Sequence, residues 1–183
     1  MKGLTDAELL LLGLVAEMPR HGYQIDQVIE QRGMREWTQI GFSSIYFVLG
    51  RLRKLGLVTA GKPPRRNASA KAKKIYSVTP AGRRTLEAQT IAALRDVQPV
   101  YSPVLLGMIN WSVLGRQPAL KALAARRGAI EAELARLAAI QVEQQPLPDF
   151  VEAIFDYSLG QLRAEAAWVA HTLAYMTDKP WLE

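Results

Sequence analysis

The sequence contains no cysteine in its 183 residues, which excludes disulfide bonds, thiolate metal sites and a cysteine nucleophile. Histidine is also scarce, since only His21 and His171 are present. Neither has the acidic and serine neighbours that would suggest a catalytic triad or a metal site, and we expect His21 to make a structural hydrogen bond. Glycine-rich phosphate motifs are missing as well. The sequence therefore predicts no enzyme, with no catalytic residue, no metal and no cofactor.

Long hydrophobic runs are absent too. The apolar segment 104–114 is far shorter than the roughly 20 residues that a membrane-spanning helix needs, and it contains Asn110 and Ser112. The apolar N-terminal run is interrupted by Asp6 and Glu8 and is followed by no small-residue cleavage site, which favours a mature first helix over a signal peptide. We therefore expect a cytoplasmic protein.

Acidic side chains are few in the first half of the chain. Residues 1–97 hold 16 Lys and Arg against 8 Asp and Glu, whereas residues 98–183 hold 7 against 9. A basic half joined to a slightly acidic half suggests that the first half binds a polyanion. The alternative is a solvated surface whose charge is merely uneven.

The first half reads as an alternation of short helices and strands. Thr5 and Glu8 form a capping box at the start of a first helix, and Pro80 after Thr79 marks the start of a late one. Hydrophobic periodicity and turn residues place the remaining elements. The expected order is helices to about 17, over 23–30 and over 43–56, strands over 57–60 and 74–79, and a helix over 80–96. This order is typical of a winged helix-turn-helix domain.

The second half shows only helical patterns. After a linker at 98–103, two long helices are separated by a proline-containing turn at 144–148. The apolar seam of the last helix consists of Phe155, Leu159, Leu162, Ala166, Val169, Leu173 and Met176. Seams this narrow predict burial against a second copy of the chain. The alternative is an intramolecular bundle with a helix at 103–114.

The fold class expected from these patterns is mostly α. Residues 1–97 are expected to form a winged helix of three to four helices with a two-stranded wing, and 98–183 an α-helical dimerisation domain.

The segment 43–56 has the two-sided pattern of a recognition helix. Its apolar stripe is Ile45, Val48, Leu49, Leu52 and Leu55, and its opposite side carries Ser43, Ser44, Tyr46, Phe47, Gly50, Arg51 and Lys54. Because an α-helix fits the DNA major groove, we expect this second set to contact DNA.

Each member of that outer set has an expected role. Arg51 suits a guanine or a phosphate, Ser43 and Ser44 suit phosphate oxygens, and Tyr46 suits a phosphate or a thymine methyl. Gly50 would allow close approach. The alternative is that Tyr46 or Phe47 lies in the core and that the cations are only solvated.

The loop between the two expected strands is densely cationic. It holds Lys62, Arg65, Arg66, Lys71, Lys73 and Lys74 and no acidic residue. Cations at this density near a duplex supply sequence-independent affinity, so the loop is expected to be a DNA-binding wing. A flexible, solubilising loop is the alternative.

Three segments, LLGLVAEMPRHGYQI, SSIYFVLGRLRKLGLV and KIYSVTPAGRRTL, resemble in order and spacing the winged helix of the PadR family of bacterial transcriptional regulators. The resemblance covers about residues 5–90. It implies a homodimeric repressor of a pseudo-palindromic operator, often released by a small hydrophobic or aromatic compound, and hence a nucleoid-associated protein. Family members commonly have Pro after the recognition-helix Tyr and Glu near its end, whereas this chain has Phe47, Arg53 and Lys54, which affects the operator sequence expected.

The aromatic residues of the second half raise the question of an effector site. Trp111, Trp168 and Tyr175 could line a pocket for a planar ligand, although core packing explains them equally well. Two rival functions remain at this stage. One is a sequence-nonspecific, architectural nucleic-acid binder, and the other is a protein-interaction module whose basic loop is only solvated.

Overall fold

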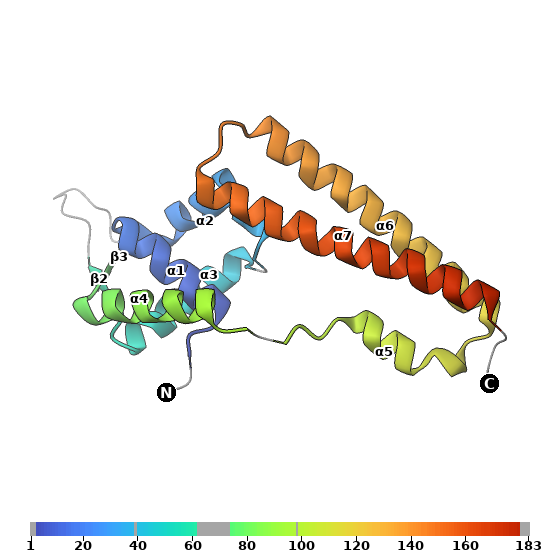
Figure 1. The fold of residues 1–183 in the computed structure, drawn as a ribbon. Helices are drawn as coiled ribbons and strands as arrows, with labels where there is room; N and C mark the ends of the chain where they lie inside the picture. Colours follow the sequence, from blue (N-terminus) through green and yellow to red (C-terminus); the bar gives the residue numbers. More distant parts are fainter. Residues whose placement is uncertain (1–2, 39, 62–73, 98, 180–183) are drawn as a thin grey trace. The chain divides into compact units, whose positions relative to one another are not determined.

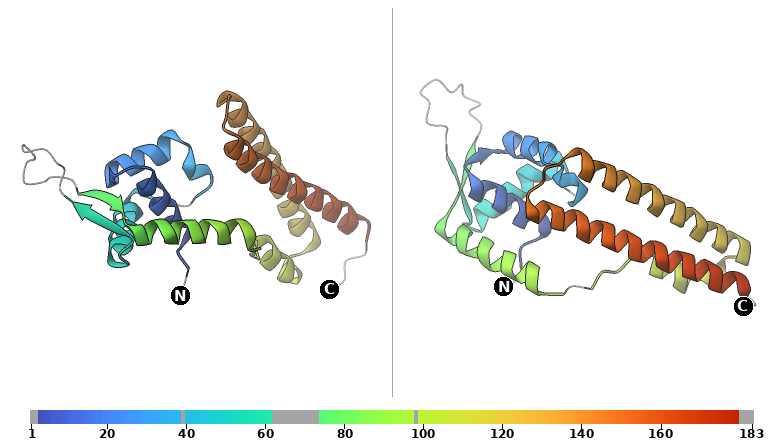
Figure 2. Two further views of the ribbon diagram at one scale, coloured as in Figure 1. Left: turned by 60° about the vertical axis from the view of Figure 1, so that its left-hand side comes forward. Right: turned by 45° about the horizontal axis from the view of Figure 1, so that its top comes forward.

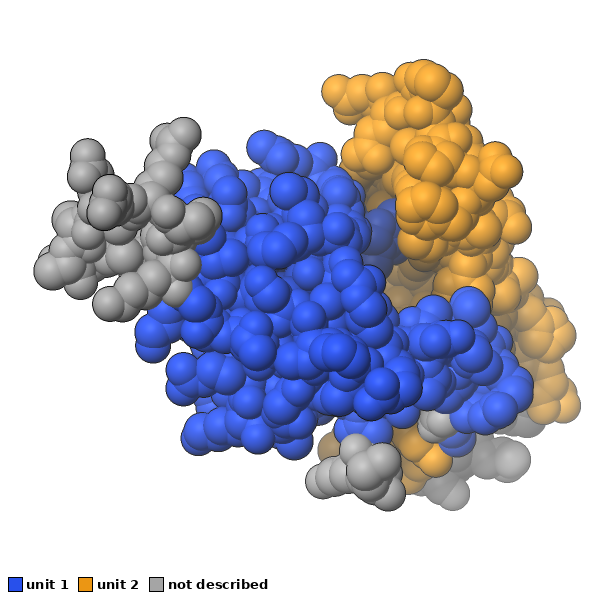
Figure 3. All heavy atoms as spheres, turned by 90° about the vertical axis from the view of Figure 1, so that its left-hand side faces the viewer, with its two compact units in different colours: residues 1–99 blue, residues 100–183 orange. Residues whose placement is uncertain are grey.

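The computed structural model describes residues 3–38, 40–61, 74–97 and 99–179 (Figure 1). It divides into two compact units, Met1–Pro99 and Val100–Glu183 (Figure 3). Helices dominate both units, and the described strands all belong to one small sheet in the first. The expected mostly α fold, with a winged helix followed by a helical region, is therefore confirmed.

The first unit has the element order of a winged helix. Its elements are α1 (Asp6–Glu17), β1 (Arg20–His21), α2 (Gly22–Gln31), the 3-10 helix η1 (Met34–Glu36), α3 (Phe42–Lys54), β2 (Val58–Gly61), β3 (Ile75–Val78) and α4 (Pro80–Arg95). The strands β2 and β3 form an antiparallel ladder, drawn as arrows in Figure 2. β1 pairs with the other edge of β3, so the sheet has three strands where the sequence predicted two.

Side-chain caps fix where α1 and α2 begin. Thr5 Oγ1 accepts a hydrogen bond from the Glu8 backbone at 3.3 Å, and Glu8 Oε2 accepts one from the Thr5 backbone at 2.8 Å, which confirms the predicted capping box. A second box opens α2, where His21 Nδ1 accepts from the Gln24 backbone N–H at 3.2 Å. His21 therefore has the structural hydrogen-bonding role expected of it.

The helix predicted over 43–56 begins one residue earlier than expected. α3 starts at Phe42 after Gly41, which is extended and makes no side-chain cap. The expected start at Ser43 or Ser44 is wrong, because the chain turns into the helix at Gly41, whose carbonyl accepts from the Ser44 backbone N–H at 3.1 Å. At the other end Gly56 has a φ of 72°, a left-handed conformation that glycine adopts without strain and that ends the helix.

The core of the first unit lies between its three leading helices and the sheet. The fully buried side chains come from all of these elements: Leu11, Leu12, Leu14, Val15, Ile25, Ile29, Ile45, Leu49, Leu52 and Val58. Most of the predicted inner stripe of α3 is thus confirmed. The prediction that Leu55 faces inward is wrong, since its side chain is exposed, and Tyr23 is exposed as well. Leu55 follows the last residue of α3, and Tyr23 is on the outer side of the first turn of α2.

The second unit is built on a long helical hairpin. Its elements are α5 (Pro103–Ile109), the 3-10 helix η2 (Trp111–Val113), α6 (Arg116–Glu143) and α7 (Asp149–Asp178). α6 and α7 lie side by side along their length in Figures 1 and 2. The turn between them matches the predicted one at 144–148, and Arg127 and Glu131 of α6 form an ion pair at 2.8 Å.

The predicted seam of α7 is buried at its centre within a single chain. Phe155, Leu159 and Val169 are buried, and the other seam residues are partly buried. Leu123 and Ile130 of α6 pack in the same cluster as Val169. Part of the seam is therefore covered within the single chain, because apolar residues of α6 pack against it. No helix of the described residues is both long enough and apolar enough to span a membrane.

Candidate nucleic-acid interface

The outer side of α3 is open to solvent, as a recognition helix requires. Ser43, Ser44, Tyr46, Phe47, Arg51 and Lys54 are all exposed, and Gly50 is partly exposed. Phe47 is the most exposed of the large apolar side chains on this helix, at 71%. The alternative that Tyr46 or Phe47 belongs to the core is therefore wrong. A Cβ atom added at Gly50 would meet no atom within 4 Å, so the helix surface there is unobstructed.

Tyr46 is held in place by two neighbours. Its ring lies against Gly22, where an added Cβ atom would be only 2.6 Å from Tyr46 Cε1. Phe42, one turn earlier on α3, meets the same ring edge-to-face with centroids 5.6 Å apart. A half-exposed tyrosine with its ring fixed on two sides presents its hydroxyl in a defined place. Gly22 is needed because any larger residue would displace that ring.

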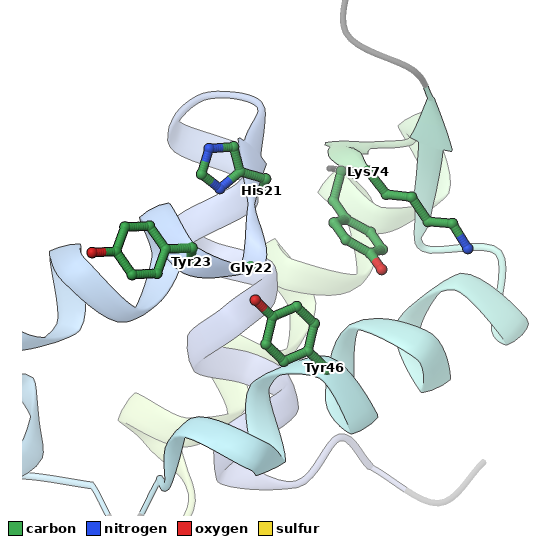
Figure 4. Close-up of a pocket in the computed structure, with 6 residues that line it drawn as sticks. His21, Gly22, Tyr23, Tyr46 and Lys74 are labelled. Carbon is green, nitrogen blue, oxygen red and sulfur yellow. The ribbon is translucent and has the colours of Figure 1, made fainter. Parts of the chain in front are cut away.

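A pocket of about 260 Å³ joins Tyr46 to the base of the wing. It is lined by His21, Gly22, Tyr23, Tyr46, Lys74 and Tyr76. Figure 4 shows Tyr46 rising from α3 toward Gly22, where β1 meets α2, with Lys74 on the sheet side of the pocket. Tyr76 is 9% exposed. Elements α2, α3 and β3 thus contribute to one concave surface.

The pocket contains residues that the sequence reasoning missed. Tyr23 and Tyr76 received no site role from the sequence alone, yet both residues contribute to the lining of the pocket. The phenols of Tyr46 and Tyr76 and the ammonium group of Lys74 are hydrogen-bond donors suited to an anion. The signal available in the sequence was the pair Gly22 and Tyr23, because a glycine next to an aromatic residue at a helix start allows close packing there.

Arg51 is not a free cation. Its Nε lies 2.6 Å from Oε1 of Glu8, which is 2% exposed, while the Arg51 side chain is 51% exposed. No donor among the described residues is aligned well enough on Oε1 to form a hydrogen bond, so this contact is an ion pair by distance. The other carboxylate oxygen accepts from Thr5. Glu8 therefore links the cap of α1 to the outer side of α3.

The remaining cations of the predicted interface fall into two groups. Lys54 and Lys74 are exposed. Lys62, Arg65, Arg66, Lys71 and Lys73 lie outside the described residues. Arg83 and Arg84, in the first turns of α4, are exposed cations that the sequence analysis did not single out.

A separate ion-pair cluster ties α1 to α2. Glu17 accepts hydrogen bonds from Arg32 at 2.7 and 3.0 Å and from Arg20 at 2.9 Å. The hydrogen bonds from Arg32 lower the pKa of the Glu17 carboxyl below its ordinary value, with Arg20 contributing in the same direction and partial burial opposing both. This cluster is structural, since it joins the end of α1, β1 and the end of α2.

The three aromatic residues proposed for an effector site are only partly brought together. Trp111 and Trp168 pack on the same apolar cluster of the second unit, whereas Tyr175 is exposed and accepts a hydrogen bond from Lys179 at 2.9 Å. Trp111 also lines a cavity of about 200 Å³ between α5, η2 and α6, together with Met108, Leu123 and Arg126. Within the described residues, no cluster of side chains could hold a metal ion.

Comparison with known proteins supports the winged-helix assignment. The model of the transcriptional regulator PadR-like family matches residues 11–88. Bacillus subtilis PadR in complex with operator DNA is similar in fold, with a TM-score of 0.71, 22% identity, and coverage of 94% of this chain and 99% of that chain. The same protein in complex with p-coumaric acid has a TM-score of 0.70 and 23% identity, and the match covers 93% of this chain and 98% of that chain. The Vibrio cholerae virulence activator AphA has a TM-score of 0.71 and 18% identity, and the match covers 94% of this chain and 98% of that chain.

No curated protein matches the sequence. At these identities, the likeness to the solved structures establishes the fold over nearly the whole chain. The family match covers α2, α3, the sheet and most of α1 and α4, which are the elements that build the surface described above. The family that this model describes consists of transcriptional regulators and not of enzymes. Residues 11–88, within the N-terminal unit, therefore match the PadR-like family of transcriptional regulators.

Proposed function

We propose that this protein is a homodimeric repressor that binds a pseudo-palindromic operator. The outer side of α3 enters the major groove, and the segment 62–74 lies along the DNA backbone. The observation that carries the proposal is the pocket that Tyr46 and Lys74 line together. A helix that reads DNA and the base of a cationic wing must share one surface to act on the same duplex, and these two residues do.

The pocket itself suits a phosphate of the DNA backbone. Lys74 supplies a positive charge, and Tyr46 and Tyr76 supply hydroxyl donors from two different elements. Such contacts fix the position of a protein on the duplex without reading its sequence. The base-reading contacts then fall to the residues around Phe47 and Gly50, on the unobstructed part of α3.

The dimer is supported by apolar surface that the single chain leaves uncovered. On α5, Leu105, Leu106 and Ile109 are all exposed, and no residue of that helix is buried. Exposed apolar side chains gathered on one short helix indicate a protein interface. The seam residues Leu162, Ala166, Leu173 and Met176, partly buried in the single chain, are the members of the predicted dimerisation set that a second copy would still cover.

A small aromatic ligand would release the operator in this proposal. The cavity beside Trp111 is apolar and carries one cation, Arg126, whose Nε donates to Glu165 at 2.7 Å. One of the similar structures is a complex with p-coumaric acid, a planar aromatic acid of the size that such a cavity accommodates. The cell compartment that follows from operator binding is the cytoplasm, at the nucleoid.

The experiment that tests the proposal is a titration of labelled duplexes with the full-length protein over a range of salt concentrations. Phe47→Ala is expected to reduce the preference for the operator over a scrambled duplex, because it removes an exposed side chain from the part of α3 that is proposed to read bases. Lys74→Gln is expected to weaken both duplexes alike and to lower the log–log salt slope by about 0.9.

Lys121→Gln serves as the matched control for charge, since Lys121 is exposed on α6, and we expect it to leave DNA binding unchanged. Equal affinity of the wild-type protein for operator and scrambled duplexes would support the architectural binder instead. Binding of a protein partner with no dependence on salt and no binding of DNA would support the interaction module.

A further inference from the structure

We propose that Glu8 is a positioning residue for DNA binding, which acts by holding one edge of the Arg51 guanidinium so that its other edge meets a DNA phosphate. This inference rests on the proposed DNA-binding function. It concerns a buried acid in α1 that neither the capping box nor the core requires in charged form.

The first step is that Glu8 needs a cation. Its side chain is 2% exposed, and Oε1 lies in the interior with no aligned hydrogen-bond donor among the described residues. A buried carboxylate is costly unless a charge of opposite sign lies against it. Arg51 Nε at 2.6 Å supplies that charge. The capping bonds to Thr5 use only Oε2, so they leave this requirement unmet.

The second step is that the contact with Glu8 engages only Nε of the Arg51 guanidinium. The planar guanidinium of arginine presents donors along two edges. Nε faces Glu8, whereas the described residues provide no partner for the two terminal nitrogens, and half of the side chain is exposed. The terminal nitrogens are therefore available to an oxygen anion from outside the protein.

The third step is the location of Arg51 on α3. It follows Phe47 by one helical turn and precedes Lys54 by three residues, so all three lie along the same side of the helix. Both of these neighbours are exposed. This is the side that the proposed function turns toward DNA. A guanidinium held by a buried acid loses less conformational freedom on binding than a free lysine or arginine does.

The test uses Arg51→Lys in the full-length protein, with a duplex that the wild-type protein has selected from a random pool. The lysine ammonium still neutralises Glu8, but once drawn to that carboxylate it offers no second edge to a phosphate. We expect the dissociation constant to rise about tenfold and the salt slope to fall by about 0.9. The melting temperature is expected to stay near that of wild type.

Arg163→Lys is the matched control, because Arg163 is an exposed arginine of α7 that makes no ion pair among the described residues. It keeps its charge, and we expect no change in affinity or slope. A purely structural ion pair between Glu8 and Arg51 predicts that Arg51→Lys also leaves affinity and slope unchanged, and that result would overturn the inference.

A second variant, Glu8→Gln, keeps an acceptor for Thr5 and releases Arg51. We expect the affinity for selected and scrambled duplexes alike to fall several-fold, because the arginine is no longer oriented toward the phosphate. An unchanged affinity would count against positioning even if the variant melts at a lower temperature. Failure of the wild-type protein to select any duplex would instead contradict the proposed function itself.

Discussion

At the scale of single residues, glycines mark where another group approaches the backbone of the first unit. Gly22 lies under the Tyr46 ring, Gly82 lies under the backbone of Leu57, and Gly50 has open space above it. In the first two cases the approaching group belongs to the protein. At Gly50 no described protein atom approaches, which is the condition for close contact with DNA.

Gly50→Ala tests this interpretation directly. Alanine has the higher helix propensity, so we expect the free energy of unfolding to rise by about 0.5–1 kcal/mol. Operator affinity is expected to fall at the same time, since the new methyl group projects toward the duplex. Chemical denaturation and a DNA titration measure the two effects.

Gly128→Ala is the control for that substitution, because Gly128 lies in α6 with equally open space around it. It should give the same gain in stability and no loss of DNA binding. If Gly50→Ala keeps full operator affinity, the DNA does not approach α3 closely at this position.

Gly82→Ala is expected to have the opposite effect on stability. An added Cβ atom would lie 2.1 Å from the Leu57 carbonyl oxygen and 2.9 Å from Val78 Cγ2. The backbone oxygen cannot move without breaking the hydrogen bond that it accepts from Thr79 at 3.0 Å. We expect a loss of about 2–4 kcal/mol in the free energy of unfolding, measured by urea denaturation. A loss below 0.5 kcal/mol would show that α4 shifts freely against the strand.

At the scale of elements, the sequence predicts the position of the helices better than it predicts the pairing of the strands. The stripe Ile45, Leu49 and Leu52 located the inner side of α3, and the capping box of Thr5 located the start of α1, because both signals are local. The strand β1 was missed since two residues carry no periodic pattern. It exists because β3 has a free edge to which Arg20 and His21 can pair.

In the candidate site, too, the sequence predicts residues with a local signal and misses those that depend on contacts between distant elements. Tyr46 and Lys74 were predicted from residue type and position, whereas Tyr76 and Glu8 became visible only through contacts between elements distant in sequence. A strand tyrosine and a capping glutamate each have a sufficient local explanation. Nothing in their immediate sequence indicates that one lines a pocket and that the other pairs with Arg51.

The ion pairs of Glu17, which join α1 to α2, predict that the melting temperature depends on pH. The bound arginines lower the pKa of Glu17 in the folded protein, so the cluster adds stability above the ordinary carboxyl pKa and loses it as pH falls through the lowered value. The melting temperature of wild type should therefore exceed that of Glu17→Gln most at pH 6 to 7. The effect is small because Glu17 and Arg32 are exposed to solvent.

The measurement is a series of thermal unfolding curves from pH 7 to pH 3 for both proteins. The difference between them is expected to shrink below about pH 4.5. A difference that stays constant across this range would show that the cluster contributes through packing and not through charge.

At the scale of the whole molecule, the proposal requires two copies of the chain. Leu106 and Ile109 are 64% and 76% exposed on α5, and the account assigns them to the dimer interface. Replacing both with glutamate should give a folded monomer of 20.3 kDa in place of a species of twice that mass. Helix content should be unchanged, because neither side chain is buried in the single chain.

Light scattering during size-exclusion chromatography measures this mass. Val142→Glu on α6 is the control, as it adds an acid at another exposed apolar residue and should leave the dimer intact. A double α5 variant that remains dimeric would place the interface on other elements.

The central claim, that α3 and the wing base of a dimer act on one duplex, is tested most directly by selecting bound fragments from a pool of random duplexes with the full-length protein. The account predicts recovered fragments with two inverted half-sites, separated centre to centre by one helical turn of about 34 Å or by a multiple of it. Fragments with no shared sequence, or with a single half-site and no symmetry, would contradict it.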